Sequence, residues 1–173
     1  MTFSDRYLTL TIAYHPDTTR IGESAVVGSA TEGLRLSLGR LEPQFAQRGE
    51  QPRGLEDSFI SRRGLGLNLN AEEFSVEVND SPIECWLEGK FVSERQAIPS
   101  WQLERGVQIK LSDRILLVAH CTSSDARRGA SRGLIGCSDT IQIARTQAGL
   151  MASEDGPVIV EGEPGVGKAL LAR

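Results

Sequence analysis

The chain has 173 residues and a mass of 18.8 kDa, the size of one ordinary domain or of one domain with a fragment of another. Apolar residues make up 39% and charged residues 24% of the chain, a globular composition that excludes wholesale disorder. Aromatic residues account for only 5% and the net charge is −4, which argues against nucleic acid as the main partner of this chain.

Cysteine and histidine are few and widely spaced. Cys85, Cys121 and Cys137 form no CxxC pair, and His15 and His120 lie far apart, so we expect no metal site. The start of the chain lacks the charge and apolar pattern of a signal peptide, and no apolar run approaches the roughly 18 residues of a membrane span. We therefore expect a protein of the reducing cytoplasm with no membrane partner.

Short segments with strand character fill the first 120 residues or so. Their spacing of about 8–12 residues, with no amphipathic helix between them, predicts an all-β sandwich. A long polar stretch at 42–56 is predicted as a loop. The uniformly apolar run 115–119 is predicted to be buried on both faces. The predicted strands are 7–14, 24–28, 34–38, 64–70, 74–78, 83–87, 107–111 and 115–119.

The pattern changes after residue 121. Residues 122–133 are rich in Ser, Arg, Gly and Ala and read as a linker. A helix is predicted from the capping-box spacing that begins at Asp139. A short buried strand at 157–160 and a helix at 169–173 follow. We therefore expect a β domain at 1–121, a linker at 122–133 and, at 134–173, the truncated start of an α/β domain.

Residues 162–168 match GxxxxGK between the predicted strand and helix, which is the context of a phosphate-binding loop. Glycines let successive backbone N–H groups point at a polyphosphate, and Lys168 would reach its outer phosphates. Ala169 stands where many such loops have a Ser or Thr that binds magnesium. In a complete domain the nucleotide-binding residues would be Gly162, Glu163, Pro164, Gly165, Val166, Gly167, Lys168 and Ala169.

Nucleotide hydrolysis also needs an acidic residue from a later strand and usually an arginine from a neighbour. The chain extends five residues past Lys168, so neither can follow the loop here. We therefore expect no ATPase activity, and no cofactor, for this chain. No GxSxG or HExxH motif is present, so we do not expect an enzyme of another kind.

Residues 133–141, with their Leu-Ile-Gly opening, and residues 158–173 resemble the start of the AAA+ ATPase domain of sigma-54-dependent, NtrC-like bacterial transcription activators. The resemblance covers about 40 residues. It implies that an intact parent protein would use ATP and Mg²⁺. It also implies contacts to sigma-54 RNA polymerase and DNA only through parts absent here: the GAFTGA loop, the Walker B motif and the helix-turn-helix.

A second resemblance covers most of residues 7–120. Gly39-Arg40 follows an alternating segment, Ser61-Arg62-Arg63 precedes another, and the segments 86–90 and 103–111 come later. This order resembles a forkhead-associated (FHA) domain, a sandwich of about 11 strands that binds phosphothreonine peptides through its loops.

The resemblance implies a phosphopeptide site made of Arg40, Ser61, Arg62, Arg63 and Asn79. A phosphothreonine carries about −2 charge and three acceptor oxygens, so arginine forks and a hydroxyl donor suit it. Each residue also fits an ordinary structural role. Arg40 can pair with a nearby carboxylate at 42 or 57, Ser61 can cap a turn, and the arginine pair can be a solvated surface.

The sequence departs from the FHA pattern at two positions. Gly64 replaces a histidine that braces the loop in the family. The family's peptide-binding asparagine aligns with Ile83 when residues 86–89 set the register, which leaves Asn79 as a nearby substitute.

The sequence therefore predicts a non-enzymatic module. It would bind a phosphothreonine-containing protein and so control the ATPase of a sigma-54 activator. The alternative is an FHA-like scaffold that has lost phosphate recognition and serves protein–protein interaction, dimerisation or other self-association.

Overall fold

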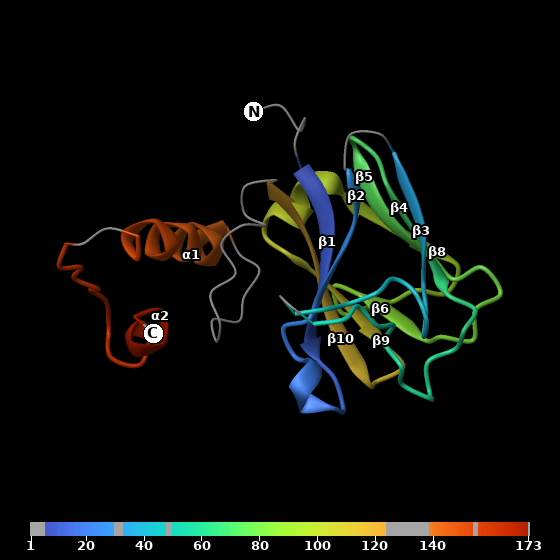
Figure 1. Ribbon diagram of the computed structural model, residues 1–173. Helices are drawn as coiled ribbons and strands as arrows, with labels where there is room; N and C mark the ends of the chain where they lie inside the picture. Colours follow the sequence, from blue (N-terminus) through green and yellow to red (C-terminus); the bar gives the residue numbers. More distant parts are fainter. Residues whose placement is uncertain (1–5, 30–32, 48–49, 124–138, 154–155, 173) are drawn as a thin grey trace.

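The computed structural model describes residues 6–29, 33–47, 50–123, 139–153 and 156–172. Its main body consists of two antiparallel sheets that face each other across an apolar core (Figure 1). The ten strands are β1 (Arg6–Tyr14), β2 (Ser24–Ser29), β3 (Leu34–Leu38), β4 (Leu65–Leu69), β5 (Glu73–Glu77), β6 (Cys85–Leu87), β7 (Lys90–Phe91), β8 (Arg95–Pro99), β9 (Val107–Leu111) and β10 (Ile115–Ser123).

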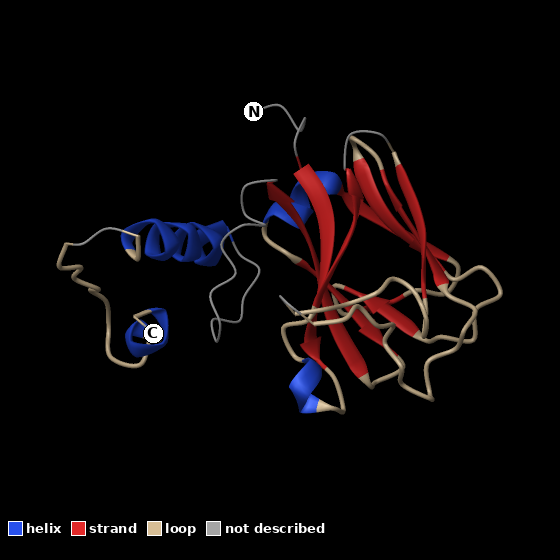
Figure 2. Cartoon of the chain, viewed as in Figure 1, coloured by secondary structure: helices blue, strands red, loops and turns tan. Residues whose placement is uncertain are grey.

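The larger sheet has the order β2-β1-β10-β9-β6-β7, and the smaller has the order β3-β4-β5-β8. Figure 2 shows that strands dominate this body and that only short helical turns interrupt it. These turns are η1 (Thr18–Arg20) and η2 (Ser100–Glu104). The all-β sandwich expected from the alternating segments is confirmed, with ten described strands where about 11 were expected.

Side-chain alternation sets the core. Leu8, Leu10 and Ile12 of β1 are fully buried, and the alternate leucines of β4 are also buried. In the smaller sheet the register places Leu38 opposite Leu65 and Leu36 opposite Leu67, so apolar residues of adjacent strands share the inner face. The intervening residues point outward.

The strands of the sandwich differ from the expected ones in three details. Residues 115–119 are not buried on both faces, because Leu116 and Val118 alternate outward and are only half-buried. The strand β8 and the turn η2 were not predicted, because the short β8 alternates only weakly. β10 also continues to Ser123, two residues past the expected domain boundary.

The predicted loop at 42–56 is not a plain polar excursion. Phe45 and Leu55 are fully buried, and isolated bridges join Ser24 to Ala46 and Phe45 to Arg53. The segment therefore lies along the sandwich with two apolar anchors.

The C-terminal part contains α1 (Asp139–Met151) and α2 (Lys168–Leu171), which add no strand to either sheet. The helix expected from Asp139 is confirmed. The predicted strand at 157–160 is wrong: the segment has no strand partner among the described residues, and Ile159 is 82% exposed. The expected linker and the Leu-Ile-Gly opening lie mostly outside the described residues.

No helix in the described part of the chain is both long and apolar enough to cross a membrane. Within the same residues, no group of three or more His, Cys, Asp or Glu side chains is placed to hold a metal ion.

The buried imidazole of His120 makes the stability of the sandwich depend on pH. His120 is 4% exposed on β10, its Nε2 lies 3.1 Å from Thr11 Oγ1, and its Nδ1 has no partner among the described residues. Burial lowers the pKa of His120 from 6.5 to about 4. Between pH 6.5 and about 4, His120 is therefore protonated in the unfolded chain but neutral in the folded chain. The sandwich loses stability as the pH falls through this range.

We expect the free energy of unfolding to drop by up to about 3 kcal/mol between pH 6.5 and 4 on account of His120. Urea denaturation at several pH values would measure this. The variant His120→Leu should show a flatter profile above pH 5. A profile as steep as that of the parent chain would contradict the assignment.

Candidate functional site

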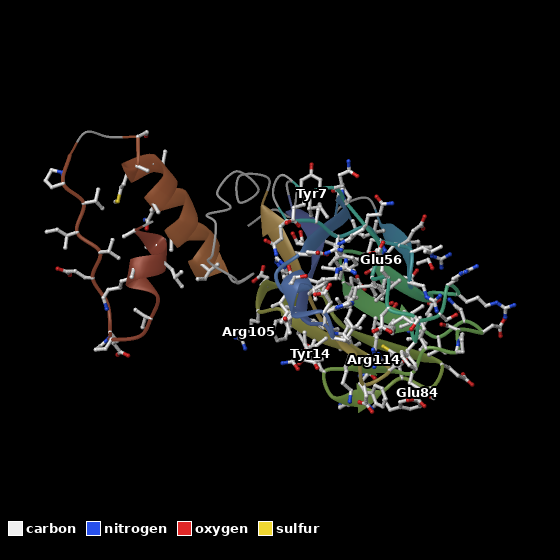
Figure 3. All side chains as sticks on the ribbon, turned by 60° about the horizontal axis from the view of Figure 1, so that its bottom comes forward. Tyr7, Tyr14, Glu56, Glu84, Arg105 and Arg114 are labelled. Carbon is white, nitrogen blue, oxygen red and sulfur yellow. The ribbon has the colours of Figure 1, made fainter. Side chains whose placement is uncertain are left out.

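Three loops meet at one end of the sandwich. The loop after β3 contains Arg40, whose backbone N–H donates to the Ser61 carbonyl at 2.9 Å in the loop before β4. The loop after β5 joins them through Ser81, whose Oγ donates to the Arg63 carbonyl at 2.7 Å. Figure 3 turns this end of the molecule forward. The loops that carry all five residues of the expected phosphopeptide site are therefore tied together.

Arg40 is half-buried, and backbone carbonyls hold its guanidinium. Nε donates to the Ile60 carbonyl at 2.7 Å, and one terminal nitrogen donates to the Ser58 carbonyl. In the described part of the chain, Arg40 forms no ion pair, so the structural role suggested for it with a carboxylate at 42 or 57 is not seen. Among the described residues no carboxylate compensates this guanidinium, and it has further N–H donors available.

Ser61 and the two arginines after it form an exposed turn. Ser61 Oγ accepts a hydrogen bond from the Arg63 N–H at 3.0 Å, so the serine does cap a turn. A hydroxyl that accepts this bond still has its own proton to donate. Arg62 and Arg63 are exposed, and neither forms an ion pair among the described residues.

Asn79 and Ile83 have different surroundings. Ile83 is 3% exposed and belongs to the core, so it cannot contact a bound peptide. Asn79 is exposed and has a φ of 41°, a conformation that asparagine tolerates better than most residues. Of the two positions, only Asn79 lies on the surface where the loops meet.

The structure gives a physical reason for Gly64. A Cβ at this position would lie 2.2 Å from Ser37 Oγ and 2.8 Å from the carbonyl carbon of Leu38. The turn at 61–64 therefore packs directly on the end of β3, and a histidine would displace it. Direct backbone contact fixes the loop where, in the FHA pattern, a histidine would brace it.

An ion pair between Asp57 and Arg114 holds the loop before β4. Asp57 is nearly buried and receives bonds from Arg114 Nε at 3.0 Å and from a terminal nitrogen at 2.9 Å. Burial alone would raise the pKa of the Asp57 carboxyl, but bonds from Arg114 and the Phe59 N–H outweigh burial and lower it. The Arg114 guanidinium also lies 4.3 Å from the centre of the exposed Phe59 ring. The charge of Asp57 is thus balanced by Arg114, and Asp57 does not balance the charge of Arg40.

A buried carboxylate, that of Glu23, holds the segment 53–56 that precedes this loop. The sequence analysis did not identify it. Glu23, 1% exposed, accepts from Arg20 at 2.5 Å and from Arg53 at 2.8 Å. Arg20 and His15 both donate to the carbonyl of Leu55. The next residue, Glu56, donates its N–H to the Arg40 carbonyl at 3.1 Å. A continuous chain of bonds therefore runs from Glu23 to the backbone of Arg40.

Charge balance decides the protonation of Glu23. Burial by itself would raise the pKa of this carboxyl, but the bonds and charges of Arg20 and Arg53 outweigh burial and hold the pKa below its ordinary 4.5. The stability that Glu23 supplies is therefore complete above its unfolded-state pKa and is lost as the pH falls through the lower folded-state pKa.

In the loop at 162–169, Gly165 and Gly167 have left-handed φ values of 84° and 90°. Lys168 Nζ donates to the carbonyls of Gly162 at 2.8 Å and Glu163 at 2.7 Å. The lysine thus folds back over the loop that precedes it.

The chain is similar to the solution structure of the FHA domain of an Arabidopsis thaliana hypothetical protein, with 17% sequence identity and a TM-score of 0.49, over 71% of this chain and 91% of that chain. No family model and no curated protein matches the sequence.

The variant Glu23→Gln tests whether the buried carboxylate fixes the loop. It leaves Arg20 buried without a counter-charge, so we expect a loss of about 3–5 kcal/mol in the free energy of unfolding. The matched control is Glu73→Gln, which breaks the exposed pair with Arg95 and should cost at most about 1 kcal/mol. Chemical denaturation of both variants gives the comparison. Equal losses would contradict the assigned role of Glu23.

Proposed function

We propose that the sandwich is an FHA-type module that binds a phosphothreonine peptide at the loops after β3, before β4 and after β5. The observation that carries the proposal is an excess of positive charge at these loops. Arg40, Arg62 and Arg63 lie on two loops that are bonded to each other, and among the described residues none of the three has an acidic partner. In the loop before β4, Asp57 is engaged by Arg114 and Glu56 by Arg53. Glu42, in the loop after β3, is exposed and forms no ion pair among the described residues.

The chemistry suits a phosphate dianion. Three guanidinium groups with free N–H donors, and the hydroxyl of Ser61, supply charge-assisted hydrogen bonds to phosphate oxygens. Asn79 supplies amide groups that can bond to the backbone of an extended peptide. The whole chain carries a net charge of −4, so this positive cluster contrasts with the overall charge.

The segment after residue 138 extends the proposal. Its Gly162-to-Lys168 loop and the helix at Asp139 retain the sequence features that resemble a sigma-54 activator ATPase. We infer that phosphopeptide docking on the sandwich regulates such an ATPase in a parent protein. That ATPase would use ATP and Mg²⁺ and would contact sigma-54 polymerase and DNA through other segments.

Two observations in these loops favour a second function. Ser58 and Ile60 already occupy two nitrogens of Arg40, and two large apolar side chains, Leu41 and Phe59, are 56% and 71% exposed in the same loops. A protein-binding or dimerisation surface without phosphate recognition would also present these features.

Peptide binding separates the two functions. The full chain would be titrated with a degenerate peptide library fixed at phosphothreonine and with its unphosphorylated counterpart, using fluorescence anisotropy. We expect binding only of the phosphorylated library, and at least a tenfold loss with the double variant Arg62→Ala/Arg63→Ala, because two charge-assisted contacts are removed.

The control is Arg105→Ala. Arg105 follows η2, which is bonded through Ser100 to Ala71 at the opposite end of β4 from the loops, and Figure 3 labels it. This variant should bind like the parent chain. Equal binding of phosphorylated and unphosphorylated libraries would reject phosphate recognition and favour the second function.

A further inference from the structure

Five side chains on the outer face of the larger sheet form one continuous row. The registers pair Tyr14 with Leu116, Leu116 with Lys110, Lys110 with Trp86, and Trp86 with Phe91. These pairs cross β1, β10, β9, β6 and β7 in their order in the sheet. Directly paired residues share a face, and the strand neighbours of the three middle residues are buried in the core, so the row points away from the core. We call these five residues the outer row.

The outer row is largely apolar, and its two ends are exposed. Tyr14 is 51% and Phe91 is 57% exposed, whereas Leu116 and Trp86 are half-buried. The Trp86 and Phe91 rings meet edge to face, with their centres 5.5 Å apart. Five strands spaced about 4.8 Å apart give the row a length of about 19 Å. Contiguous exposed apolar surface of this kind is typical of an interaction site.

An ion pair lies at the middle of the outer row. Lys110 Nζ donates to the carboxylate of Asp113, in the turn between β9 and β10, and lies 4.1 Å from the centre of the Trp86 ring. Both charged side chains are exposed, Asp113 at 72% and Lys110 at 41%. A wholly apolar partner would remove this pair from water without compensating it. The partner that fits the outer row must therefore offer a cation and an anion between apolar groups.

We propose that the outer row is the contact surface between two copies of this chain. A two-fold axis that lies between the copies and runs along the strands reverses the row. Tyr14 of one copy then faces Phe91 of the other, and Leu116 faces Trp86. Lys110 stays at the centre of both rows, where Lys110 of each copy can bind Asp113 of the other. A second copy thus supplies the apolar groups, the cation and the anion that the row requires.

The size of the surface sets the expected strength. One row of side chains covers less than the roughly 800 Å² per partner of a stable complex, so we expect a weak dimer that forms at high concentration. The outer row contains no residue of the proposed phosphopeptide site, and it is also distinct from the exposed Leu41 and Phe59. A dimer through this row would therefore leave two phosphopeptide sites free.

Sedimentation velocity of the full chain, from about 1 to about 200 µM, tests the contact. The average mass should rise toward that of two chains. Phe91→Ala and Tyr14→Ala should each weaken association about tenfold, because the symmetry removes every contact twice. Both residues are more than half exposed, so thermal melting should hardly change. The matched control is Trp101→Ala, which removes an aromatic ring that is 52% exposed on η2, outside the row, and should associate like the parent chain.

A charge exchange tests the two-fold arrangement itself. Lys110→Glu and Asp113→Lys each leave like charges at the centre of the row, so each variant alone should associate at least tenfold more weakly than the parent chain. In an equimolar mixture, each altered residue meets an opposite charge on the other variant. The mixture should therefore associate more strongly than either variant by itself, with thermal melting showing that both are folded.

Three outcomes would overturn the inference. The chain could remain a monomer up to about 200 µM. It could associate equally well with and without Phe91 and Tyr14, or lose association in the Trp101→Ala control. The mixture of the two folded charge variants could associate no better than each alone. Phosphopeptide binding should be the same in Phe91→Ala as in the parent chain, so a failure of the proposed function would be seen separately.

Discussion

The arrangement of the loops depends on one buried carboxylate. Glu23 lies between Arg20 and Arg53 and links the start of the chain to the long segment between β3 and β4. A charge buried to this extent is tolerated only when it is paired and hydrogen-bonded, and here both conditions are met. Through the Leu55 carbonyl and the Glu56 N–H, this link extends to the backbone of Arg40. A long segment that its composition predicts as a polar loop is thereby fixed against the sandwich.

The charge balance at the loops follows from the same bonds. Glu23 engages Arg53, Asp57 engages Arg114, and no acidic side chain among the described residues is paired with Arg40, Arg62 or Arg63. Backbone carbonyls orient Arg40 without neutralising it. Preorganised positive charge of this kind lowers the ordering cost of binding an anion.

Much of the fold could be predicted from the sequence, and some of the site could not. Strict alternation, as in Val107, Ile109 and Leu111, predicts that the segment is a strand, which of its faces points to the core and which side chains are buried. The roles of Glu23, Leu55 and Asp57 could not be predicted, because each depends on a contact between residues far apart in the chain. The strand expected at 157–160 failed for a related reason: an apolar run forms a strand only when a neighbouring strand pairs with it. A hollow on the outer face of β3 and β4 depends on Gly64 and Gly66 lying beside particular side chains, which only the register of the sheet reveals.

The central claim is that the bonded loops after β3, before β4 and after β5 bind phosphothreonine. The most direct test is an amide NMR titration of the ¹⁵N-labelled full chain with the phosphothreonine peptide library. We predict shift changes concentrated at residues 39–42, 58–64 and 78–81, with none from the unphosphorylated library. Changes confined to the turn at 70–72 and to η2, at the opposite end of the sandwich, would contradict the account, as would identical changes from both libraries.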